Sequence, residues 1–65
     1  MKQKIQRMAF ILATEGGRPA AEKFNELRPT LTGYESTMLA VEIAANLPDL
    51  EEVIFRRALW KEARS

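Results

Sequence analysis

Three breaks that contain glycine or proline divide this chain into four short segments, and they constrain its fold more than any other feature. The breaks are Gly16-Gly17, Arg28-Pro29 and Leu47-Pro48. Proline lacks a backbone N–H and glycine weakens helices and strands from within, so regular structure ends near such positions. The fold must therefore be assembled from four short elements.

These elements are predicted to be helices. Apolar residues recur at helical spacing in three of the segments, and the second segment is too short to judge by spacing. Pro19 stands where the start of a helix tolerates proline, and Thr32 and Glu35 have the spacing of a capping box. The sequence predicts an all-α fold, a compact bundle of three to four short helices at about 2–14, 19–27, 33–46 and 50–63, in a single domain over residues 1–65.

The size and composition of the chain argue against an enzyme. A domain of 65 residues buries only about 60% of its unfolded surface. The chain has no Cys and no His, which removes disulfides, thiolate chemistry, the common zinc ligands and an imidazole base. We expect no catalytic residues, cofactor, metal or small-molecule substrate, and we expect idealised helix packing or self-association to supply stability.

The last two predicted helices carry more apolar surface than one small core can cover. In 33–46, Tyr34, Met38, Val41 and Ala45 form one stripe and Leu39, Ile43 and Leu47 form another, which predicts that Val41 and Ile43 are both buried, on opposite sides. In 50–63, Leu50, Val53, Ile54 and Trp60 point one way, and Phe55 and Leu59 point another.

This surplus predicts a protein interface. Its expected residues lie off the main faces of the first and last helices, together with the neighbouring tryptophan: Phe10, Ile11, Phe55, Leu59 and Trp60. The leading hypothesis is a small regulatory or accessory protein that docks to another protein and pairs with itself as a homodimer. The alternative is that these are the scattered exposed apolar residues that any monomer carries.

Charges are sorted into blocks along the chain. The net charge is +3 over residues 1–28, −5 over 29–55, where there is no base, and +3 over 56–65. Such sorting indicates electrostatic matching inside the fold, between subunits or toward a partner. If the helices run up and down, one end of the bundle would carry a basic patch that could bind nucleic acid or an acidic protein. Its residues would be Lys2, Lys4, Arg7, Arg57, Lys61 and Arg64, with Trp60 among them. The alternative is that these residues are ordinary solvated charges at the chain termini, with no binding role.

A second hypothesis is a DNA-binding regulator. Residues 21–25 are similar to the A-x-x-L-G signature that closes the first helix of a helix-turn-helix, with Asn25 in a left-handed turn. In a helix-turn-helix at about 19–35, a recognition helix beginning at Arg28 would contact nucleic acid through Arg28, Thr30 and Thr32, and Arg18 is a further possible contact. The capping box at Thr32 instead predicts a later helix start, and the acids that follow would repel phosphates.

The apolar run at 8–13 follows three bases but is too short for a signal sequence or a membrane span. We expect a cytoplasmic protein with no membrane partner.

Overall fold

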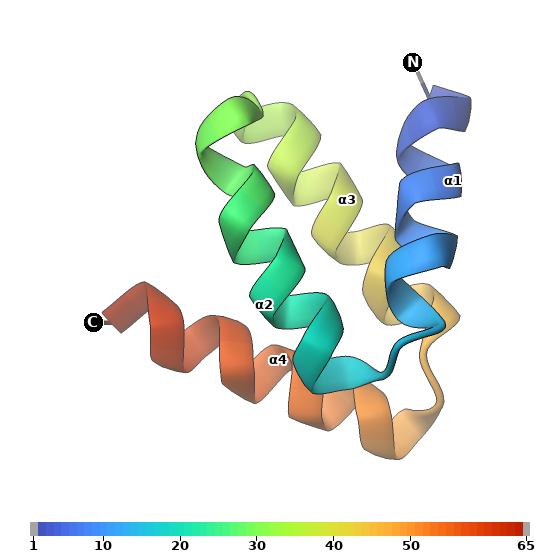
Figure 1. The fold of residues 1–65 in the computed structure, drawn as a ribbon, viewed down its shortest axis with the longest axis vertical. Helices are drawn as coiled ribbons and strands as arrows, with labels where there is room; N and C mark the ends of the chain where they lie inside the picture. The colour runs from blue at the N-terminus through green and yellow to red at the C-terminus, as the bar shows by residue number, and fades with distance from the viewer. Residues whose placement is uncertain (1, 65) are drawn as a thin grey trace.

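The fold is all-α. The computed structural model describes the backbone of residues 2–64 and the side-chain surroundings of residues 3–59. Helices α1 (Lys2–Ala13), α2 (Gly17–Leu27), α3 (Gly33–Asn46) and α4 (Asp49–Arg64) are joined by short links, and a 3-10 turn, η1 (Arg28–Thr30), follows α2 (Figure 1). The predicted compact helical bundle is confirmed, and most of the predicted helix ends agree within one or two residues.

The two glycines between α1 and α2 have different roles. Gly16 has a φ of +102°, the left-handed conformation that glycine adopts without strain, and its N–H donates to the Ala13 carbonyl at 3.1 Å to end α1. Gly17 is the first residue of α2, so this helix begins before Pro19. A Cβ on Gly17 would overlap the backbone oxygen of Glu51, so glycine is needed here for close helix packing.

The helices pack as two crossed pairs. α1 packs chiefly on α3 and α2 chiefly on α4, whereas α3 and α4 make few contacts with each other. Figure 1 places the start of α1 and the end of α4 on opposite sides of the molecule. The condition for one basic end, four helices that run up and down, is therefore not met, because α4 packs across α2 instead of returning alongside α1.

The core lies where these pairs meet. Its buried side chains are Ala9 and Leu12 of α1, Ala20, Ala21 and Phe24 of α2, Leu39, Ile43 and Leu47 from α3 and the residue after it, and Phe55 of α4. The Phe24 and Phe55 rings meet edge to face, with centroids 6.4 Å apart. The predicted burial of Ile43 is confirmed.

Two predicted side-chain positions are wrong. Val41 was expected in a second buried stripe but is 57% exposed, because the core occupies only the Leu39 and Ile43 side of α3. Phe55 was expected at an interface but is 1% exposed. Gly17 approaches the α4 backbone at Glu51 and Phe55, so the Phe55 side of α4 packs on the core, and Leu50, Val53 and Ile54 are exposed.

Candidate docking surfaces

Residues 28–32 do not begin a recognition helix. The Thr30 hydroxyl donates to the Leu27 carbonyl at 2.7 Å within the 3-10 turn. The Thr32 hydroxyl accepts from the Glu35 N–H at 3.1 Å, and the Glu35 carboxylate accepts from the Thr32 N–H at 3.0 Å. The predicted capping box is confirmed, and α3 therefore begins at Gly33.

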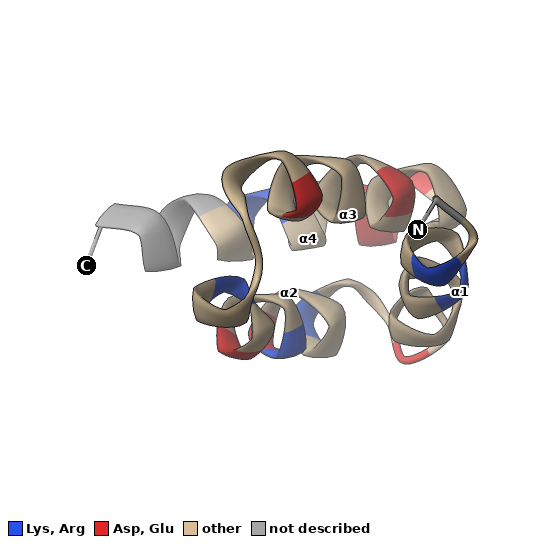
Figure 2. Cartoon of the chain, turned by 90° about the horizontal axis from the view of Figure 1, so that it is seen from above, with Lys and Arg blue, Asp and Glu red and all other residues tan. Residues whose placement is uncertain are grey.

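The proposed nucleic-acid contacts are spread over several elements in the described part of the chain. Asn25 lies within α2 and does not adopt the left-handed turn that the helix-turn-helix interpretation required. Arg18 and Arg28 lie at opposite ends of α2, about 15 Å apart by helical rise. Figure 2 shows acidic positions along α3 itself, and these would face phosphates unfavourably.

The remaining basic candidates are split between two places. Lys4 and Arg7 lie on α1, and Arg57 lies on α4, which ends on the other side of the molecule (Figure 1). The other members of the expected basic end, namely Lys2, Trp60, Lys61 and Arg64, lie outside the residues whose side chains the structure describes.

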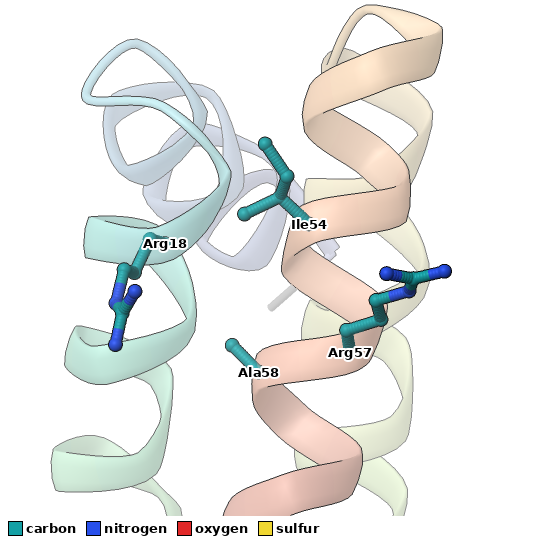
Figure 3. A pocket seen from close by; sticks show the side chains of 4 residues that line it. All are labelled: Arg18, Ile54, Arg57 and Ala58. Atoms are coloured by element: carbon teal, nitrogen blue, oxygen red, sulfur yellow. The ribbon is translucent and has the colours of Figure 1, made fainter.

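A shallow pocket of about 270 Å³ lies between α2 and α4, lined by Arg18, Ile54, Arg57 and Ala58. Figure 3 shows that the Arg18 and Arg57 guanidinium groups point away from each other, on either side of Ile54 and Ala58. Arg18 is also 3.9 Å from the Glu22 carboxylate of its own helix. The two arginines therefore do not converge on a common anion.

Exposed apolar side chains gather on two helices at one end of the molecule. We call this set the corner surface: Phe10 (60% exposed) and Ile11 (54%) of α1, with Leu50 (73%), Val53 (48%) and Ile54 (36%) of α4. The end of α1 and the first turns of α4 lie on the same side in Figures 1 and 2. A 2.7 Å hydrogen bond from the Gly17 N–H to Glu51 Oε1 fixes the start of α2 to that part of α4.

The corner surface overlaps the predicted interface only in part. The predicted exposure of Phe10 and Ile11 is confirmed. Leu59 is half-buried against the core, and Phe55 is fully buried. Sequence reasoning placed Leu50, Val53 and Ile54 on the main face of the last helix, because both of its apolar stripes satisfy helical periodicity equally well.

A second apolar surface lies where α3 and α4 diverge, and we call it the α3–α4 groove. It consists of two adjoining hollows of about 250 and 200 Å³ that share Ala40, Val41 and Leu59. The first hollow also contacts Phe24 and Arg28, and the second contacts Ala44, Phe55 and Arg56. Sequence reasoning missed this groove. The available signal was the pair of small residues Ala40 and Ala44 beside Val41.

The described residues show no three His, Cys, Asp or Glu side chains placed to hold a metal ion. Within the same part of the chain, no helix has the length and hydrophobicity needed to span a bilayer. Comparisons with models of known protein families, with curated proteins and with solved structures found no match.

Proposed function

We propose that this chain is a small, non-enzymatic regulatory or accessory protein of the cytoplasm, which acts by docking to another protein and by pairing with itself through the corner surface. One observation carries this proposal. Five large apolar side chains of α1 and α4 are between 36% and 73% exposed, while the core that the structure describes contains only nine buried residues. Large exposed apolar side chains at one end of so small a domain are typical of an interaction site.

The expected strength of docking follows from the exposed area. Full burial of a large apolar side chain contributes about 1.5–3 kcal/mol, so covering these half-exposed residues contributes about 5 kcal/mol from this side of an interface. A partner would contribute a similar amount. Association itself costs about 4–15 kcal/mol in lost freedom and ordering. At most about 6 kcal/mol remains, so we expect dissociation constants of tens of micromolar or weaker.

DNA binding ranks lower as a proposal. Its candidate residues Arg28, Thr30 and Thr32 belong to a turn and a helix cap, and Thr30 and Thr32 already make local hydrogen bonds. The helix that follows, α3, carries acids and no base. We expect weak binding or none to a nonspecific duplex near physiological salt.

Sedimentation at several protein concentrations, with and without a nonspecific duplex at low salt, tests this function. The variants are Phe10→Ser/Ile11→Ser and Leu50→Ser/Val53→Ser, and the control is Tyr34→Ser, which alters an equally exposed side chain outside the corner surface. We expect the wild type and the control to associate alike and both corner variants to associate at least ten-fold more weakly. Equal association by all four proteins, or association that requires the duplex, would contradict the proposal.

A further inference from the structure

The α3–α4 groove has the form of a receptor for a helix. Its two walls are diverging helices, and its floor reaches the Phe24 and Phe55 rings of the core. Residues 36, 37, 40 and 41 of α3 line the first hollow, and residues 40, 41 and 44 line the second. The hollows are thus offset by about three residues, or about 5 Å along α3. Apolar side chains one turn apart on a docked helix have this spacing.

The charges of the groove favour an acidic occupant. Arg28 lies at one hollow and Arg56 at the other, and no acidic residue lines either of them in the described part of the chain. Arg28 is exposed to solvent, and Arg56 is 2.7 Å from the Glu52 carboxylate. Because Arg56 already pairs with Glu52 of its own helix, the preference for a negative charge lies at the Arg28 end. An apolar helix stripe accompanied by a carboxylate would therefore match the walls and that end of the groove.

The first two turns of α4 have this chemistry. Leu50, Val53 and Ile54 are exposed at positions i, i+3 and i+4, about 4.5–6 Å apart by helical rise. The same first turn carries three carboxylates. Glu51 accepts from the Gly17 N–H and Glu52 pairs with Arg56 within the chain, so Asp49 is the carboxylate that can face a basic groove end. Arg57 follows Ile54 on this face and limits the stripe to two turns. The chain thus carries both a groove and a segment that fits it.

We infer that the groove receives the start of α4 from a second copy of this chain, with Leu50 in one hollow and Val53 and Ile54 in the other. This inference rests on the proposed function and names the partner of the α4 part of the corner surface. The inserted segment and the groove are different patches, because the groove uses α3 and the later residues Phe55, Arg56 and Leu59 of α4. Such a head-to-tail contact between copies leads to an open filament or to a closed ring of subunits.

A mixing experiment with two exposed-site variants tests this arrangement. Leu50→Ser/Val53→Ser removes the inserted side chains, and Val41→Glu places a carboxylate in the groove wall at a position that is 57% exposed. Arg28→Glu is a second groove variant, which reverses the charge at one end of the groove. Circular dichroism establishes that each variant is folded. The readout is the sedimentation mass of each protein alone and of equimolar mixtures.

We expect wild-type protein to grow beyond two copies as its concentration rises, and each variant alone to associate at least ten-fold more weakly. In a mixture, either groove variant supplies an intact α4 segment and the Leu50/Val53 variant supplies an intact groove. The mixture should therefore form a dimer of twice the 7.4 kDa chain mass and no larger species. A mixture that stays monomeric would overturn the inference.

If the groove variants associate like wild type while the Leu50/Val53 variant does not, the groove assignment fails and the proposed docking surface stands. A wild type that remains monomeric throughout would overturn both.

Discussion

Gly17→Ala tests the contact that orients α4. A Cβ at this position would overlap the backbone oxygen of Glu51 and lie 3.1 Å from the Phe55 nitrogen, and backbone atoms of a helix cannot move aside singly. α2 and α4 would have to separate, which would loosen the Phe24–Phe55 contact. Overpacking of this kind costs about 1–3 kcal/mol. A domain of this length has a total stability of about 3–10 kcal/mol, so the loss is a substantial fraction of it.

Gly33→Ala is the matched control. Gly33 is also the first residue of its helix, but a Cβ there would meet nothing within 4 Å. Replacing glycine by alanine at such a compatible site stabilises by about 0.4–1 kcal/mol, chiefly through the unfolded chain. Since 1 kcal/mol corresponds to about 4–8 °C for a domain of this size, Gly17→Ala should lower the melting temperature and Gly33→Ala should raise it. Thermal unfolding followed by circular dichroism measures both. If Gly17→Ala melts at or above the wild-type temperature, the close approach of α2 to α4 is refuted.

Four further substitutions test the packing of α2 and α3 by urea unfolding. Ile43→Ala should lower the free energy of unfolding by about 2–5 kcal/mol, because Ile43 is fully buried. Val41→Ala, on the exposed side of the same helix, should change it by less than about 0.5 kcal/mol. Similar values for the two variants would show that α3 is rotated about its axis relative to this structure. Thr32→Ala should lower the free energy of unfolding by about 1 kcal/mol by removing the hydroxyl of the capping box, and no change would mean that this cap does not hold the start of α3. Asn25→Ala should raise the free energy of unfolding by about 1 kcal/mol, because both polar atoms of the Asn25 side chain are buried without a hydrogen-bond partner in the structure. A free energy of unfolding below that of the wild type would indicate that the Asn25 amide is hydrogen-bonded in solution.

The ends of the helices were predictable because local chemistry sets them. Gly16 ends α1, and the Thr32–Glu35 capping box starts α3; both depend on a few neighbouring residues, whatever the rest of the fold does. The faces of the helices were not predictable in the same way. Helical periodicity supports either stripe of α4, and the choice of Phe55 over Leu50 depends on the approach of Gly17, a residue 34 positions before Glu51 in the chain.

The groove could not be predicted for a related reason. It exists because α3 and α4 diverge, and their angle depends on how each packs against a different helix, α1 for one and α2 for the other. Ala40 and Ala44 allow close approach at that position, but small residues in a helix also occur where nothing docks. The charge blocks predicted electrostatic matching only in general terms and did not indicate that Arg28 and Arg56 border the same groove.

An NMR dilution series tests the docking account most directly, because each backbone amide reports on its own surroundings. Spectra of isotope-labelled protein are recorded from tens of micromolar to about one millimolar, the range in which we expect association. The account predicts concentration-dependent shifts at residues 10–11 and 49–54 of the corner surface and at residues 40–44 of the groove, with little change around the exposed Tyr34. Spectra that do not change with concentration, or shifts that avoid both surfaces, would contradict it.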